Sequence, residues 1–404
     1  MSDKVNFAWP VSSEHSIVLQ HFTSKTESIM DKLAGRRIII FGAGIRGCTL
    51  ASILEQRGQR DILFCDNNPE KQGNRINEHD IVSLNETLSF GNSRIYLVSP
   101  ENSNSMCQQL EHIGLVESKD YFSFDVSAYD IYVSEYLRQL SNHILIIGDC
   151  AFTHIAFIDK CLDSLGDMLK SHYGSNHCKV LGMHGMGWRA YYHIVKSMLA
   201  RGEKPVQLVV LLALEALTSK AHLMPRTQHS QLIQKLAAAI GNADSELSEY
   251  AQLTEERFNR FQIESFASAN SAKNEPSEKL FMKMNYLFSI KDTSEGVIYL
   301  IKTVKLMNEC NVPIVFYIPP VNYMQGEKYF GDEFNRKYKE NFEKLFSFLN
   351  RELLEYHVAD ASHLLDSNEF AATNTIDETS NYSGRRKQVR FLTEHEEIRS
   401  ALAI

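Results

Sequence analysis

Residues 36–47 read RRIIIFGAGIRG, and this stretch decides the first half of the fold. The apolar run at positions 38–41 is typical of a buried strand, and glycines follow at positions 42, 44 and 47. The next residues, IRGCTLASILEQRG, have helical spacing and a glycine at their end. A strand, a glycine turn and a helix in this order predict a parallel sheet with crossover helices.

The same alternation extends along the chain and predicts two α/β domains. Strand-like runs DILFCD, SRIYLVSP and YFSFD complete a first domain over residues 36–125. We expect residues 1–35 to form a polar, helical extension and residues 126–141 to form a connector. A second domain over residues 142–404 has strand-like runs HILIIGD, CKVLGMHG, VQLVVLLAL, VPIVFYIPP and HVADAS. The polar, helical stretch at about 219–289 is expected to be an insertion between its third and fourth strands.

The composition of the chain argues against several classes of function. The chain has 404 residues, of which 44% are hydrophobic and 23% charged, with a net charge of −8. This balance argues against nucleic-acid binding, which needs a clustered basic face. The most apolar run, residues 206–217, is too short to span a bilayer, so no integral membrane segment is expected.

The start of the chain lacks the basic-then-apolar order of a signal peptide. The seven cysteines are scattered without any C-x-x-C, which favours a reduced, cytoplasmic protein. The histidines between positions 172 and 193 match no compact metal pattern, so no metal site is predicted.

The glycine motif predicts an anion site. Gly42 would allow the tight turn, Gly44 would let the backbone approach a phosphate, and Gly47 would permit close helix–strand packing. The helix N-terminus that follows offers N–H groups to an anion. Asp66 ends the next strand, where a carboxylate accepts hydrogen bonds from ribose hydroxyls. The alternative is that the three glycines serve only the turn and its packing.

FGAGIRGCTLASILEQRG followed by ILFCDNNPEKQG resembles a small Rossmann-type module found beside sugar-modifying and polysaccharide-biosynthesis enzymes. Asp66, Asn67 and Gly73 match its second block. The resemblance covers about residues 36–125. It implies recognition of a nucleotide or nucleotide-sugar by Gly42, Gly44, Gly47, Asp66 and Asn67, while the sequence itself identifies no cofactor.

Residues 146–150, IIGDC, resemble the first block of the SGNH (GDSL-like) hydrolase superfamily. The resemblance implies a three-layer α/β/α domain with a nucleophile on the first turn, here Cys150 after Asp149. It also implies an oxyanion hole completed by a glycine and an asparagine on later loops. Gly185 or Gly187 fits the glycine, whereas the third loop reads Glu-Ala-Leu-Thr at positions 215–218.

The family places an Asp-x-x-His near its C-terminus, and residues 377–385, DETSNYSGR, resemble that block. Asp377 fits the acid, and Asn381 and Arg385 fit its end as candidate substrate-binding residues. Where the block would place histidine, the sequence has Thr379 or Ser380. The serine and the histidine of the family are therefore both replaced.

Other side chains are candidates for the base. His154 lies four residues after Cys150, which puts both on one face of a helix starting at the turn. His222 and His229 flank Arg226, which fits a phosphate or carboxylate partner. The alternative is that these three are capping and surface residues, and that Cys150 is a small core side chain.

Three hypotheses follow. The first is an acyltransferase or esterase acting on a sugar or nucleotide-linked sugar in surface-polysaccharide biosynthesis, with Cys150 as nucleophile. The second is a catalytically degenerate protein that binds a glycan or docks a partner enzyme of a glycan pathway. The third is an NAD(P)-dependent oxidoreductase built on the glycine motif. The expected ligands are small molecules or glycans.

Overall fold

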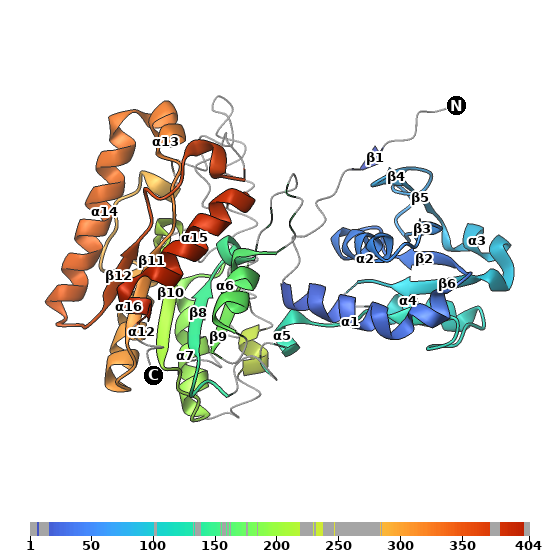
Figure 1. Cartoon of the computed structure of the whole chain (residues 1–404), viewed down its shortest axis with the longest axis horizontal. Helices are drawn as coiled ribbons and strands as arrows, with labels where there is room; N and C mark the ends of the chain where they lie inside the picture. The colour runs from blue at the N-terminus through green and yellow to red at the C-terminus, as the bar shows by residue number, and fades with distance from the viewer. Residues whose placement is uncertain are drawn as a thin grey trace. The chain divides into compact units, whose positions relative to one another are not determined.

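A computed structural model gives the architecture of the chain (Figure 1). The structure describes residues 6–7, 16–100, 103–131, 133, 139–153, 155, 159, 161, 163–174, 177–183, 185–218, 229, 232–236, 246, 283, 285–371 and 380–399. The chain divides into two compact units, Met1–Ala128 and Tyr129–Ile404. Both contain sheets covered by helices, which confirms the predicted α/β class.

The first unit is built on one mixed sheet. In spatial order its strands are β1 (Asn6–Phe7), β4 (Arg75–Ile76), β5 (His79–Val82), β3 (Ile62–Cys65), β2 (Arg37–Phe41), β6 (Arg94–Val98) and β7 (Tyr121–Ser123). All neighbouring pairs are parallel except β4 and β5, which form an antiparallel hairpin. The predicted glycine-motif strand, β2, therefore lies at the centre of the sheet.

Apolar side chains hold this unit together. Its helices are α1 (Ser16–Leu33), α2 (Ile45–Gln56), α3 (Leu84–Thr87), η1 (Leu88–Ser93) and α4 (Asn104–His112). Ile39 and Phe41 pack with Tyr96 and with Leu110 of α4 in one buried cluster. The predicted N-terminal extension contains α1, whose fully buried Phe22 meets the unit's own Phe124 edge to face at 5.2 Å. Helix α1 is thus part of the core of this unit.

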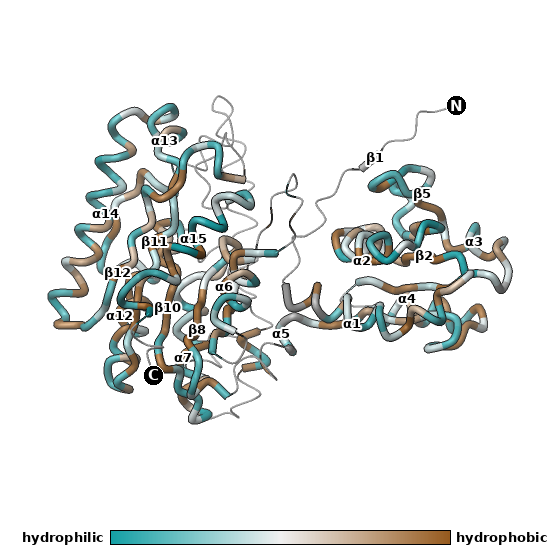
Figure 2. The backbone as a smooth tube through the Cα atoms, viewed as in Figure 1, coloured by the Kyte–Doolittle hydropathy of each residue, from teal (hydrophilic) through white to brown (hydrophobic). Residues whose placement is uncertain are grey.

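The second unit has a five-stranded, fully parallel sheet. In spatial order its strands are β12 (His357–Asp360), β11 (Ile314–Ile318), β10 (Gln207–Leu211), β8 (Ile144–Gly148) and β9 (Cys178–Gly182). Counted along the chain this is the order 5-4-3-1-2, the doubly wound order of flavodoxin-like sheets. In Figure 2 strands β8 and β10 are strongly hydrophobic, as expected for strands buried on both faces.

Helices cover both faces of this sheet. The described helices of this unit are η3 (Cys150–Phe152), α6 (Leu165–Tyr173), α7 (Trp188–Ala200), η4 (Leu214–Leu217), α12 (Glu295–Glu309), α13 (Tyr323–Phe330), α14 (Asp332–Arg351), η6 (Ser367–Glu369), α15 (Tyr382–Glu394) and α16 (Glu396–Arg399). A further short helix, α5 (Ala128–Ile131), includes the boundary between the two units. On one face Tyr317 packs with Leu165 of α6 and Leu392 of α15. The next side chain along β11, Phe316, points to the other face and contacts Trp188 of α7.

Strands β10 and β11 are neighbours in the sheet although the predicted insertion separates them in the chain. Most of that insertion lies outside the described residues, so its expected helical character stays a prediction. Among the helices that the structure describes, none is both long and apolar enough to cross a bilayer.

Candidate functional site

The carboxyl edge of the second sheet contains a topological switch point. The chain passes from β8 to β9 on one side and then returns to β10 on the other side of β8. Loops at such a point diverge, which leaves a crevice where doubly wound folds bind ligands. Cys150 follows β8 at this edge and is half-buried.

Close packing fixes the turn that presents Cys150. Asp149 is 2% exposed, and its carboxylate accepts a hydrogen bond from the Ala151 N–H at 2.8 Å. A Cβ atom on Gly148 would lie 2.4 Å from the ring of Phe152, so only glycine fits there. The Asp149 side chain therefore fixes the turn by binding the backbone of the turn.

The loop after β9 is tied to this turn. The Met183 N–H donates to the carbonyl of Gly148, the last residue of β8, at 3.2 Å. Gly185 has a φ of +65°, which favours glycine, and Gly187 is the N-cap of α7 without any atom near its missing side chain. The first two blocks of the predicted site are thus brought to the same edge of the sheet.

An ion pair between a buried arginine and a half-buried glutamate lies on the helices next to these loops. Arg189, in the first turn of α7, donates to Glu295 at the start of α12 at 2.7 Å, and the Arg189 side chain is 10% exposed. Gly296 allows α12 to approach η4, because a Cβ atom there would lie 2.8 Å from the Ala216 carbonyl. Sequence reasoning missed this pair because no local pattern links positions so far apart.

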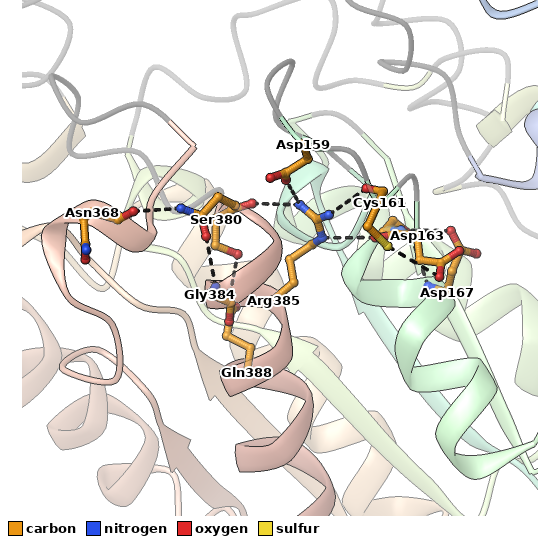
Figure 3. Close-up of polar contacts among 11 residues, drawn as sticks. Asp159, Cys161, Asp163, Asp167, Asn368, Ser380, Gly384, Arg385 and Gln388 are labelled. Atoms are coloured by element: carbon orange, nitrogen blue, oxygen red, sulfur yellow. Dashed lines mark hydrogen bonds and ion pairs between the residues drawn. The ribbon is translucent and has the colours of Figure 1, made fainter. Parts of the chain in front are cut away.

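The C-terminal block is held by a polar network (Figure 3). Arg385 is 1% exposed, and its guanidinium donates to the Asp159 carboxylate at 2.6 Å. It also donates to the carbonyls of Asp163 at 3.0 Å, Cys161 at 3.1 Å and Ser380 at 3.1 Å. These contacts join α15 to the segment that follows the Cys150 turn. Because of these contacts Arg385 has a structural role, whereas the sequence predicted that it would contact the substrate.

Asn381 and Ser380 are likewise engaged within the protein. Asn381 caps α15 by accepting from the Gly384 N–H at 3.1 Å, and its amide donates to the Asn368 carbonyl at 2.7 Å. Ser380 accepts from the Gln388 amide at 2.6 Å, and Gln388 accepts from the Tyr317 hydroxyl at 2.7 Å. Asp377 and Thr379 lie outside the described residues.

One of the predicted histidines can be placed. His229 is buried, and its Nδ1 lies 3.3 Å from the hydroxyl of Tyr129 at the start of the second unit. That contact does not link it to the Cys150 turn. His154, His222 and Arg226 lie outside the described residues.

Sequence reasoning also missed His363, which directly follows the last strand. Asp360, Ala361, Ser362 and His363 have the spacing Asp-x-x-His, which was expected only in residues 377–385. The exposed His363 ring stacks on Tyr323 with ring centroids 4.0 Å apart. Strands β12 and β8 are three strand spacings apart in the sheet, about 14 Å, and the loops that carry His363 and Cys150 leave the same edge of it.

In the first unit the three motif glycines have different environments. A Cβ atom on Gly47 would lie 2.1 Å from the Gly42 carbonyl oxygen, and one on Gly42 would lie 2.9 Å from Pro100. Gly42 also has a φ of +114°. Gly44, the N-cap of α2, has extended backbone and open space where its side chain would be. Close packing explains why glycine is required at positions 42 and 47, whereas packing does not require glycine at position 44.

Asp66 and Lys71 bind the same turn. Asp66 is buried, with its side chain 11% exposed, and its carboxylate accepts from the Ala43 N–H at 2.8 Å and from Lys71 at 3.1 Å. Lys71 also donates to the Ala43 carbonyl at 2.8 Å. The predicted ribose-binding carboxylate therefore already supports the glycine turn, and its neighbour Asn67 is exposed.

Comparison with known proteins assigns no family. No protein-family model matches the chain, and a search of curated proteins found no relative. Among the described residues, no three His, Cys, Asp or Glu side chains are grouped so as to hold a metal ion.

Proposed function

We propose that the second unit transfers or hydrolyses an acyl group on a sugar or nucleotide-linked sugar, with Cys150 as nucleophile. The observation that supports this best is the position of Cys150 at the β8–β10 switch point, beside the glycine loop after β9. The parallel sheet with helices on both faces agrees with the SGNH-like resemblance. The N–H group of Gly185 or of Gly187, in the loop after β9, is the candidate oxyanion donor.

The reaction has two steps. The base takes the proton of the Cys150 thiol, and the thiolate attacks the carbonyl carbon of the acyl donor. A C–S bond forms, the ester C–O bond breaks, and the leaving alcohol takes the proton from the base. A sugar hydroxyl or water then attacks the thioester after giving its proton to that base, and the thiol is released. The candidate bases are His154, His222 and His229, as the sequence predicts.

Turnover of 4-nitrophenyl acetate tests this proposal. We expect activity that is lost in Cys150→Ala and retained in Cys161→Ala, a half-buried cysteine in the Arg385-bound segment. Cys150→Ser separates a thiol-specific reaction from one that a hydroxyl also performs. Equal activity of the wild type and Cys150→Ala would refute the assignment.

A second candidate is a non-catalytic glycan-binding or scaffold protein. The observation that favours it is Ser380, which stands at one of the two positions of the family's histidine and has its hydroxyl bonded to Gln388. A hydroxyl in that setting cannot act as the base. Absence of any acyl adduct at Cys150, together with glycan binding by the intact chain, would support this candidate.

For the first unit we propose nucleotide or nucleotide-sugar binding at Gly44, because neither packing nor backbone conformation requires glycine there. Titration with UDP-glucose and with NADH tests this proposal. Binding of NADH would favour the oxidoreductase hypothesis, and binding of UDP-glucose would favour the sugar hypothesis. Gly44→Val should abolish either, and retention of binding by this variant would contradict the site.

A further inference from the structure

An ion pair links the two loops that flank the Cys150 turn. Strand β8, which Cys150 follows, lies between β9 and β10 in the sheet. The loop after β9 leads into α7, and Arg189 lies in the first turn of that helix. Glu295 begins α12, and its carboxylate accepts from the Arg189 guanidinium at 2.7 Å. The pair therefore fastens the start of α7 to the start of α12.

Close packing extends this link to the loop after β10. A Cβ atom on Gly296 would lie 2.8 Å from the carbonyl oxygen of Ala216 and 3.1 Å from the Cα atom of Leu217. Both residues belong to η4, which follows β10. The start of α12 is thus in close contact with that loop, and Glu295 directly precedes the contact. Through this contact the ion pair joins the loops on both sides of β8.

The other end of the loop after β9 is fixed to the strand that carries the proposed nucleophile. The Met183 N–H donates to the carbonyl of Gly148, the last residue of β8, at 3.2 Å. Gly187 is the N-cap of α7, and Arg189 lies two residues further along the chain. Gly185 and Gly187, the candidate oxyanion donors, therefore lie between two anchors. The ion pair is the anchor on the helix side.

The position of Arg189 is electrostatically unfavourable for its own helix. The first turn of a helix is partly positive, so an acidic side chain stabilises it and a basic side chain does not. Glu295, the first residue of α12, has the favoured charge, whereas Arg189 is the second residue of α7. The Arg189 side chain is only 10% exposed, and its guanidinium lies 5.3 Å from the centroid of the Tyr299 ring. A buried residue that contradicts a local preference in this way indicates a functional requirement.

We propose that the Arg189–Glu295 pair positions the loop after β9, so that the N–H of Gly185 or Gly187 faces the carbonyl oxygen of the substrate that Cys150 attacks. Arg189 and Glu295 are positioning residues in this proposal, because they act through the loop and not by contact with the reacting atoms. The inference rests on the proposed acyl-transfer function. It adds two residues that should change the rate of acylation.

The time course of Cys150 acetylation by 4-nitrophenyl acetate, followed by the intact mass of the full chain, tests this proposal. Circular dichroism at the assay temperature shows whether each variant is folded. Arg189→Met should lower the rate constant at saturating ester by about 10- to 100-fold, as expected for a small misplacement of a group that acts on the transition state. The ester concentration that gives half of the maximal rate should stay within about twofold of the wild-type value. Glu295→Gln keeps the side-chain volume and should have the same effect.

The double variant Arg189→Met with Glu295→Gln separates one shared role from two independent effects. Both substitutions break the same pair, so the double variant should be within about twofold of the slower single variant. Arg189→Lys keeps a charge beside Glu295 and should recover most of the rate constant. Arg351→Met is the matched control, since Arg351 pairs with Asp292 at 3.1 Å just before α12 and this pair does not include α7. It should be acetylated at the wild-type rate.

Wild-type rate constants in Arg189→Met and Glu295→Gln, multiplied losses in the double variant, no recovery in Arg189→Lys, or an equal loss in Arg351→Met would each overturn the positioning role. A raised half-saturating concentration with an unchanged rate constant would also overturn it, because Arg189 would then act on substrate binding. Failure of the proposed function gives a different result. An adduct that is absent from the wild type, or that persists in Cys150→Ala, would refute Cys150 as the nucleophile and the positioning role with it.

Discussion

Substitution of Arg385 by glutamine should destabilise the second unit strongly. Arg385 and Asp159 are 1% and 8% exposed in their side chains, and their charged atoms lie 2.6 Å apart. Glutamine removes the positive charge and leaves the Asp159 carboxylate buried without a cationic partner. It also removes guanidinium bonds to three backbone carbonyls, those of Asp163, Cys161 and Ser380.

The expected loss in the free energy of unfolding follows from the burial of this ion pair. Breaking a buried ion pair by removing one partner costs about 3–5 kcal/mol, because an uncompensated charge remains. The free energy of unfolding can be measured by urea titration of Trp188 fluorescence in a Trp9→Phe background, since Trp188 lies in the core of the second unit. Adding Asp159→Asn to Arg385→Gln should recover part of the loss, because the buried charge is then gone.

The control is Arg390→Gln on the same helix. Arg390 pairs with Glu394 at 3.0 Å, but the two side chains are 78% and 62% exposed. Exposed ion pairs of this kind contribute about 0–1 kcal/mol to the free energy of unfolding. The reasoning is refuted if Arg385→Gln costs no more than Arg390→Gln, or if the double variant loses the full sum of the two single losses.

Three further results are expected. Gly47→Ala should destabilise the first unit by about 1–3 kcal/mol, since its methyl group would meet the Gly42 carbonyl, whereas Gly44→Ala should change unfolding by less than about 1 kcal/mol. Burial alone would raise the pKa of Glu246, but hydrogen bonds from lysines of α7 and α12 lower this pKa to about 2. The ionised Glu246 should therefore stabilise the fold above pH 4.5, and this stabilisation should be lost as the pH falls towards 2. Glu246→Gln should remove that acid-side loss from the pH dependence of the urea midpoint. Burial raises the pKa of Cys178 to about 12, so iodoacetamide at neutral pH should label the half-buried Cys161 well before Cys178, as peptide mass spectrometry can check.

Much of the sheet architecture could be predicted from sequence because central parallel strands are continuous apolar runs. The runs RRIIIF, HILIIGD and VQLVVLLAL became β2, β8 and β10. The edge of the first sheet could not be predicted. Its β4–β5 hairpin turns at Asn77 and Glu78, both with positive φ, without the Asn-Gly signal of such turns. Each of these short strands buries a single isoleucine, too little for a periodic pattern.

The sequence predicted where the candidate site lies in the fold, but it predicted less well which contacts the side chains of the site make. Position follows from topology, because a turn after the first strand of a parallel sheet lies at the ligand-bearing edge. The role of Arg385 depends on acceptors more than 220 residues away in the chain, which no local motif contains. His363 was missed because the Asp-x-x-His spacing was expected only in residues 377–385, whereas Asp360 and His363 have it directly after the last strand.

The most direct test of the proposed nucleophile is the intact mass of the protein after brief exposure to 4-nitrophenyl acetate, followed by peptide mapping. We predict one acetyl group per chain, located on Cys150, absent in Cys150→Ala and unchanged in Cys161→Ala. Acetylation that persists at full level in Cys150→Ala, or that maps to Cys161 or to surface lysines in the wild type, would contradict Cys150 as the nucleophile.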